Sequence, residues 1–147
     1  MGLSGSPMYD MQKHIVEDYM TKSPVVIDEN ATLKEAWELL EREPFTHLPV
    51  IDADGVVCGI LSETDLHHYK RFFENLDAPE ETIKTSLLVK EVMSAHLVTI
   101  SPGATIQEAN DLLLAKGVRA LPVTEEQKII GIISETDILR YYSDRYK

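Results

Sequence analysis

The hydrophobic and polar positions of this chain change period from one segment to the next. After residue 32, apolar residues recur at i, i+3, i+4 and i+7, which is the buried stripe of an amphipathic helix. Thr32 and Glu35 have the spacing of a capping box at its start, and Glu43-Pro44 should end it. The stripe that we expect in the core consists of Leu33, Ala36, Trp37 and Leu40.

Runs rich in β-branched residues flank this helix and predict strands. Val25–Ile27 precedes the helix, and residues 46–51 and 56–61 follow it. The last two runs are joined by Asp52-Ala53-Asp54-Gly55, which predicts an antiparallel hairpin with its glycine at positive φ. Residues 62–73 predict a second helix, so the unit is β-α-β-β-α.

The same unit occurs twice in the chain. Placing residues 16–51 on residues 89–124, an offset of 73, gives 13 identical positions out of 36. After the hairpin the offset falls to 72, because the turn of the second copy is shorter by one residue. The heptapeptide GILSETD at residues 59–65 then returns as GIISETD at residues 131–137. A duplication of this extent indicates two copies of one structural unit.

The repeats suggest the domain organisation. We expect residues 9–73 to form the first repeat, starting with a short helix at 9–20, and residues 86–147 to form the second. Residues 74–85 are polar and are expected to be a linker. Residues 1–8 have no apolar stretch, which is typical of a flexible N-terminus or a cloning remnant.

The composition narrows the class of protein. A formal charge of −11 argues against nucleic acid and anionic membranes as partners, which are bound through clustered Lys and Arg. Residues 16–70 hold 12 acids and 4 bases (net −8), and residues 89–147 hold 8 and 7 (net −1), so an anion is expected in the second half. A lone cysteine, Cys58, and no apolar run of about 20 residues are typical of a soluble cytoplasmic protein.

Taken together, these motifs resemble the tandem CBS-domain pair, or Bateman module. The first copy carries the resemblance in VEDYM at 16–20, ATLKEA at 31–36, LPV at 48–50 and the heptapeptide at 59–65, and the second copy repeats it. The similarity extends over about residues 9–147. It implies an α/β (α+β) fold in which two β-α-β-β-α repeats pack sheet to sheet about a pseudo-twofold axis, with clefts between them.

The resemblance also implies a function. Proteins of this family are regulatory sensors, so we expect this chain to bind an adenine nucleotide (AMP, ADP or ATP) in the interrepeat clefts and to signal through a homodimer. It would use no catalytic cofactor and could control a protein partner. Two alternatives stay open, namely a ligand-free protein–protein interaction module and a sensor of S-adenosylmethionine.

The Ser-x-x-Asp pairs at 62–65 and 134–137 have two interpretations. Each pair has the pattern of a helix N-cap, which needs no ligand. In the CBS pattern, however, the hydroxyl residue and the Asp hold the two ribose hydroxyls, and an ionised carboxylate can accept both bonds. The residues expected to bind ribose are Ser62, Thr64, Asp65, Ser134, Thr136 and Asp137.

The resemblance suggests where phosphate and adenine would bind. A basic residue just before the LPV strand often contacts phosphate; the positions here are Arg119, which could equally be a surface cation, and His47, which could be structural. Lys22 is a further candidate by position. The expected adenine-slot residues are Thr21, Ser23 and Val25 with the Ser134 site, and His96, Val98 and Thr99 with the Ser62 site.

Catalysis and metal binding are not expected. The chain has no Ser-His-acid set, no paired nucleophile and base, and no metal-spaced cluster. His67 and His68 are adjacent, and neighbouring residues on a helix diverge by about 100°, so they do not suit one ion. Cys58 aligns with Ile130 of the second copy and is expected to be a core residue rather than a nucleophile.

Overall fold

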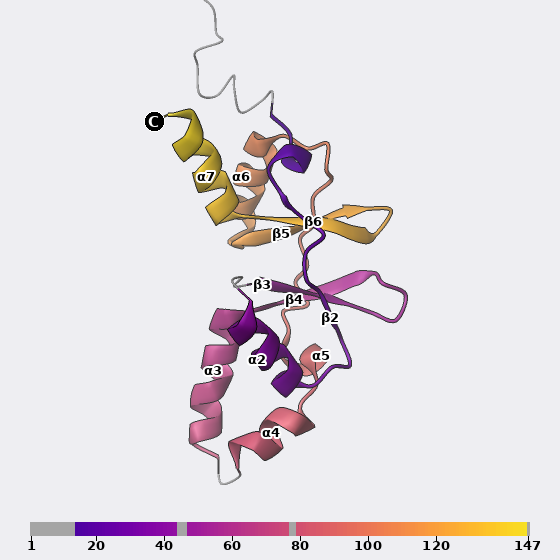
Figure 1. Cartoon of the computed structure of the whole chain (residues 1–147), viewed down its shortest axis with the longest axis vertical. Helices are drawn as coiled ribbons and strands as arrows, with labels where there is room; N and C mark the ends of the chain where they lie inside the picture. The colour runs from indigo at the N-terminus through magenta and orange to yellow at the C-terminus, as the bar shows by residue number, and fades with distance from the viewer. Residues whose placement is uncertain (1–13, 44–46, 77–78, 147) are drawn as a thin grey trace, which may run out of the picture. The chain divides into compact units, whose positions relative to one another are not determined.

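The computed structural model describes residues 14–43, 47–76 and 79–146. The chain forms two compact units (Figure 1). Val25–Leu97 is the first unit, and Val98–Lys147 combines with the chain up to Pro24 to form the second unit. The units therefore differ from the sequence repeats, because the first segment of each repeat belongs to the unit that contains the hairpin of the other repeat. The α/β class is confirmed, with one three-stranded sheet in each unit.

The sheet of the first unit has the strand order β2-β3-β4. β2 runs parallel to β3, and β3 and β4 form the predicted antiparallel hairpin. Ser94 continues this sheet by an isolated bridge to Ile60 of β4. The elements of this unit are β2 (Ile27–Asp28), α2 (Leu33–Arg42), β3 (His47–Ile51), β4 (Val57–Ser62), α3 (Glu63–Glu74), α4 (Glu80–Ser86) and α5 (Val89–Val92).

The sheet of the second unit has the order β1-β6-β5, and Ile100 adds a parallel bridge to Val123 of β5. This arrangement is the same as that of the first sheet. Thr21 of β1 pairs with the second hairpin strand, β6, just as Ser94 pairs with β4 in the first unit. Thr21 and Ser94 are 73 residues apart, which is the offset of the repeat alignment. The elements are η2 (Val16–Asp18, a 3₁₀ turn), β1 (Thr21–Lys22), α6 (Ile106–Lys116), β5 (Ala120–Glu125), β6 (Lys128–Ser134) and α7 (Glu135–Arg145).

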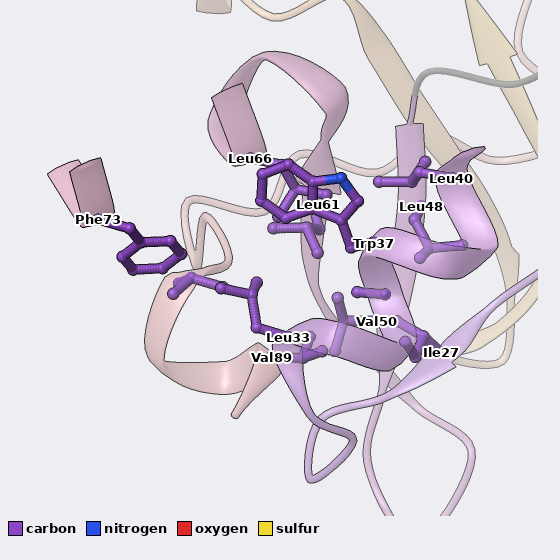
Figure 2. Close-up of a cluster of buried hydrophobic side chains, with 12 residues drawn as sticks. Ile27, Leu33, Trp37, Leu40, Leu48, Val50, Leu61, Leu66, Phe73 and Val89 are labelled. Carbon is purple, nitrogen blue, oxygen red and sulfur yellow. The ribbon is translucent and has the colours of Figure 1, made fainter. Parts of the chain in front are cut away.

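Helix α2 has the predicted cap and the predicted core face. The backbone N–H of Glu35 donates to the Thr32 hydroxyl at 3.2 Å, and the Glu35 carboxylate accepts from the Thr32 N–H at 3.3 Å. All four residues of the stripe are buried, and Trp37 lies among the leucines of the first core in Figure 2. The helix ends at Arg42, with Glu43 as its C-cap, while Pro44 lies outside the described residues.

The hairpin turns explain why the two copies differ in length. Gly55 has φ of 79°, as predicted. In the second copy Glu126 and Gln127 have φ of 51° and 69°, the two consecutive left-handed residues of a two-residue hairpin turn. The shorter turn therefore keeps the register of the strands without a glycine.

Two of the predicted elements differ from those of the structure. The strand predicted at Val25–Ile27 begins only at Ile27, because Val25 is exposed and makes no ladder pairing. The predicted helix at 9–20 contains the short turn η2, and its first residues, 9–13, lie outside the described part of the chain. None of the helices that the described residues form is long and apolar enough to span a bilayer.

The linker prediction missed helix α4. Ile83 of this helix packs against the first core, and the Lys84 ammonium lies 4.1 Å from the centre of the Trp37 ring. Lys34 of α2 forms an ion pair with Glu81. The apolar contact of Ile83 and these polar contacts stabilise α4. The sequence did not predict the helix, because seven residues are too few to show an amphipathic pattern.

Candidate functional site

The second SETD copy forms the junction between β6 and α7. Ser134 is the N-cap: the N–H of Asp137 donates to its hydroxyl at 3.3 Å, and Oδ2 of Asp137 accepts from the Ser134 N–H at 2.9 Å. The Ser134 hydroxyl and Oδ2 are themselves 3.1 Å apart. Asp137 is only 8% exposed, and Nη1 of Arg140 lies 3.6 Å from its Oδ1. The carboxylate is thus fixed at the end of a sheet and the start of a helix.

The first SETD copy makes the same junction between β4 and α3. The N–H of Asp65 donates to the Ser62 hydroxyl at 3.0 Å, and Oδ2 of Asp65 accepts from the Ser62 N–H at 3.2 Å. Asp65 is half-buried, so the carboxylate of this copy is more accessible to water than that of Asp137. Both junctions are complete capping boxes, as one of the two interpretations of the sequence predicted.

The remaining SETD positions point to the surface. Thr64 and Thr136, the second residues of α3 and α7, are both exposed. A carboxylate has about four lone-pair positions, so the cap bonds leave each Asp able to accept hydroxyl groups. Each junction therefore offers a hydroxyl, a carboxylate and an accessible threonine at the first turn of a helix, where the helix dipole favours negative charge.

Two of the expected adenine-slot residues lie beside the β6 strand. Thr21 pairs with Ile132, two residues before Ser134, and the Ser23 N–H donates to the Ile130 carbonyl at 3.3 Å. Ser23 has φ of 49°, a left-handed conformation that is uncommon for a residue other than glycine. Val25, the third residue expected in this slot, belongs to the first unit.

The equivalent segment in the first unit lies beside β4. Ser94 exchanges backbone hydrogen bonds with Ile60, at 2.9 and 3.1 Å, and exposed His96 follows two residues later. Val98 and Thr99, the other residues expected in this slot, fall within the second unit.

Two methionine–glycine pairs, for which the sequence predicted no role, lie where these segments meet the strands. A Cβ atom on Gly131 would overlap the Sδ atom of Met20, and one on Gly59 would overlap the Sδ atom of Met93. Both glycines are buried. A glycine at the first position of GI(L/I)SETD therefore lets the first segment of the other repeat lie on the strand. The identity of Met20 and Met93 in the repeat alignment was the available signal.

The expected phosphate residues occupy different positions. Arg119 is exposed, its carbonyl accepts from the Glu135 N–H at 2.9 Å, and the next residue, Ala120, pairs with Ser134. His47 pairs directly with Ser62, so it corresponds to Ala120 rather than to Arg119. The counterpart of Arg119 in the first copy, Thr46, lies outside the described residues.

Lys22 is exposed and pairs with Gly131 through its backbone. Arg119 thus lies immediately before β5, whose first residue pairs with Ser134, while Lys22 pairs with the residue three positions before Ser134 in β6. Both cations belong to the second unit, the one with the less acidic repeat.

Cys58 is half-buried on β4 rather than fully in the core. Its thiol lies 3.3 Å from Oε2 of Glu29 and 3.5 Å from the Val50 carbonyl. Burial, followed by the Glu29 carboxylate, raises the pKa of the thiol to about 11. A thiol that stays protonated at neutral pH is a poor nucleophile. His67 contacts Glu63 of its own helix at 3.3 Å, and within residues 14–43, 47–76 and 79–146 no three metal-ligating side chains converge.

Comparison with known proteins agrees with the repeat structure. CBS domain-containing protein YhcV of Bacillus subtilis is 27% identical over 123 residues, which cover 84% of this chain and 81% of YhcV. The uncharacterized protein MJ1225 of Methanocaldococcus jannaschii is 26% identical over 136 residues, 90% of this chain and 48% of MJ1225. This chain thus spans about half the length of that relative.

Solved structures show the same fold. The crystal structure of CBSX2 in complex with AMP superposes with a TM-score of 0.75 and 25% identity, and the alignment covers 91% of this chain and 99% of CBSX2. The CBS domain model matches residues 16–71 and again residues 89–144. The chain therefore belongs to the CBS domain family and carries two CBS domains in tandem.

Proposed function

We propose that this chain is a regulatory module that binds an adenine nucleotide, AMP, ADP or ATP, and catalyses no reaction. CBS-domain proteins are generally regulatory, and CBSX2, a similar CBS structure, contains AMP. The observation that carries the proposal is the duplicated junction at which a Ser hydroxyl and an Asp carboxylate are fixed at the end of a strand.

The chemistry of the junction suits a ribose. The cis-diol of a ribose presents two hydroxyl donors, and Oδ1 of Asp65 or Asp137 is not the atom that accepts the cap bond. Hydrogen bonds to a charged acceptor contribute about 1.5–3 kcal/mol each. Ser62 with Thr64, and Ser134 with Thr136, supply hydroxyl groups beside the two carboxylates.

The second junction is the better candidate for a phosphorylated ligand. Asp137 is already held by its cap and by Arg140, so little ordering is needed on binding. Arg119 and Lys22 carry positive charge near this junction, and the second repeat has a net charge of −1 against −8 for the first. Thr21 and Ser23 would line the adenine slot here, with Val25 if the ligand contacts both units, and His96, Val98 and Thr99 would do so at the other junction.

The response to the ligand would travel through a homodimer in the cytoplasm. A ligand changes an equilibrium only by the difference in its affinity for two arrangements, so the sensor must have a second arrangement to favour. A homodimer provides one, and a regulated protein partner would detect it.

Calorimetric titration tests the proposal. AMP, ADP, ATP, adenosine and S-adenosylmethionine are titrated separately into the purified chain, and thermal unfolding is measured with each ligand at 1 mM. We expect at least one nucleotide to raise the unfolding temperature and to lose affinity in Asp137→Asn. If S-adenosylmethionine binds and the nucleotides do not, the chain is a sensor of S-adenosylmethionine and the nucleotide proposal is wrong. No binding of any of the five compounds would refute it.

A second function is favoured by one observation: both junctions are complete capping boxes without any ligand. In that case the chain is a protein–protein interaction module, and the acidic first repeat would engage a basic protein surface. Asp65→Asn with Asp137→Asn separates the two functions, because these changes would leave partner binding intact in an interaction module. Mass spectrometry of small molecules released from the purified chain gives the same distinction without mutation.

A further inference from the structure

The sulfur atoms of Met20 and Met93 occupy the side-chain space of two glycines. A Cβ atom on Gly131 would lie 2.3 Å from Sδ of Met20, and one on Gly59 would lie 2.4 Å from Sδ of Met93. Each pair lies within one unit, and each methionine also packs against the core of that unit. On the side that faces the strand, neither sulfur therefore has room for a further atom.

Each methionine directly precedes a residue that pairs with a hairpin strand. Met20 comes before Thr21, the first of the two residues of β1, and Met93 comes before Ser94, which forms an isolated bridge to Ile60. Pairings this short expose most of their hydrogen bonds to water and open easily. Their closeness to the strand therefore depends on the methionine contacts beside them. We call residues 21–23 and Ser94 the edge segments.

Met20 and Met93 are only half-buried, so a molecule as small as a peroxide reaches them from solvent. Within residues 14–43, 47–76 and 79–146 they are the two methionines. A thioether is oxidised without losing a proton. The thiol of Cys58, the single cysteine, stays protonated at neutral pH and competes poorly for the same oxidant. An oxidant that acts on the folded chain therefore acts first on methionine.

We propose that Met20 and Met93 are oxidation sites, at which a hydroperoxide converts the thioether to a sulfoxide and releases the adjoining edge segment from its strand. A lone pair of the sulfur attacks one peroxide oxygen, and the S–O bond forms as the O–O bond breaks. The proton of the transferred oxygen moves to the leaving oxygen, which departs as water or, from an alkyl hydroperoxide, as an alcohol. The sulfur loses two electrons and the peroxide gains them.

The sulfoxide cannot keep the place of the thioether. Its added oxygen is polar and accepts hydrogen bonds, and burying it against the glycine without a donor is unfavourable. The side chain must turn towards water, and the residue that follows it, Thr21 or Ser94, must leave the strand. A further consequence rests on the proposed function: oxidation of Met20 would weaken nucleotide binding at the second junction, because Thr21 and Ser23 are expected in its adenine slot.

Amide hydrogen exchange, followed by NMR without any nucleotide, tests the inference. The Ser23 and Ser94 N–H groups donate to the Ile130 and Ile60 carbonyls, at 3.3 and 2.9 Å, and report on the two edge segments. The chain is made as Cys58→Ala and treated with hydrogen peroxide, and peptide mass spectrometry locates each added oxygen. We expect both amides to exchange at least about 5-fold faster after oxidation, the lower end of what overpacking causes.

Two further measurements complete this experiment. The helix amides of Ala36 and Ala109 should keep their exchange rates, because their hydrogen bonds lie within the first turns of α2 and α6. Methionine sulfoxide reductases, one for each epimer, should restore slow exchange at both serines. Unchanged exchange after both methionines are oxidised would overturn the inference. So would the absence of oxidation in the folded chain at a peroxide concentration that oxidises free methionine.

Substitutions assign the effect to these two sulfurs. Met20→Leu with Met93→Leu keeps the apolar bulk, so exchange at the edge segments should no longer respond to peroxide. Met20→Gln with Met93→Gln imitates the polarity of the sulfoxide and should speed exchange without peroxide. Met8→Leu with Met11→Leu is the matched control and should retain the full response. A full peroxide response in the first variant would overturn the inference, while nucleotide binding is decided separately by the titrations above.

Discussion

The thioether of Met20 lies where a side chain on Gly131 would have to be. Met93 and Gly59 have the same relationship in the first unit. Each methionine belongs to the first segment of one repeat, and each glycine begins the heptapeptide of the other repeat. The two repeats are therefore linked by close backbone approach at the strands that lead into the candidate ligand site.

Replacing Gly131 by alanine should destabilise the chain. The new Cβ atom would overlap the Met20 sulfur and lie 3.0 Å from the Thr21 carbonyl oxygen, so the Met20 side chain must shift and the β1 backbone must give way slightly. Overpacking of this kind costs about 1–3 kcal/mol, measured as the free energy of unfolding in urea. Gly103→Ala is the control, because nothing lies within 4 Å of its Cβ position. Equal stability of the two variants would contradict the close-approach explanation.

Asp137→Asn separates the helix cap from ligand binding. The amide oxygen can still accept from the Ser134 N–H, so we expect the free energy of unfolding to fall by no more than about 1 kcal/mol. It loses the charge that would hold a diol, and affinity for the nucleotide should fall about 10- to 100-fold in a calorimetric titration. Glu35→Gln is the matched control, since Glu35 completes the capping box of α2. Equal losses of affinity in both variants would mean that the carboxylate acts only through stability.

Cys58 should react slowly with alkylating reagents. Because its pKa is raised to about 11 from the usual 9.0, its thiolate fraction at pH 8 is roughly 100-fold lower than that of an ordinary cysteine, and alkylation by iodoacetamide should be slower to match. Glu29→Gln removes a nearby negative charge and should speed the reaction. If Cys58 in the folded chain reacts as fast as free cysteine, its pKa is not raised by burial and Glu29.

The same group predicts how stability depends on pH. The folded state favours the protonated thiol, so this contribution is complete below pH 9 and is lost as the pH rises from 9 through about 11. Cys58→Ala should lack that part of the alkaline decline. Urea unfolding of both proteins at pH 8 and pH 10.5 measures the difference, and parallel declines would exclude a contribution from Cys58.

Trp37 is the single tryptophan of the chain and reports on helix α4. Lys84→Met keeps the apolar stem over the indole but removes the ammonium group that lies 4.1 Å from the ring centre. We expect a change in Trp37 emission and a loss of about 0.5–1 kcal/mol in the free energy of unfolding. Lys90→Met, at an exposed position of α5, should alter neither quantity. An unchanged emission spectrum in Lys84→Met would indicate that α4 does not cover Trp37 in solution.

Much of the architecture was predictable because it depends on local patterns. The Thr32 cap, the buried stripe from Leu33 to Leu40 and the Gly55 turn follow from periodicity, capping and backbone sterics. Helix α4 was not predicted, since its stability comes from contacts with Lys34 and Trp37 that are distant in sequence. The pairing of Thr21 with Ile132 leaves no periodic signal either, and only the family resemblance, which grouped Thr21 with the Ser134 site, pointed to the exchange of segments between repeats.

The candidate site was predictable in part. The two Ser-x-x-Asp junctions were found through duplication, and the structure shows their hydrogen bonds. Sequence alone could not assign Met20 and Gly131 to each other. The repeat alignment already places His47 on Ala120 rather than on Arg119, and the two hairpin ladders agree with it.

The pairing of β1 with β6 has a consequence for the order of synthesis. Thr21 leaves the ribosome 111 residues before its partner Ile132 (132 − 21), so the edge of the second sheet waits for the last part of the chain. The first unit, by contrast, is one continuous stretch, Val25–Leu97, and can close before residues 98–146 are made. The chain thus has an early unit and a late unit, and the late unit joins residues 14–24 to residues 98–146 in one folding event.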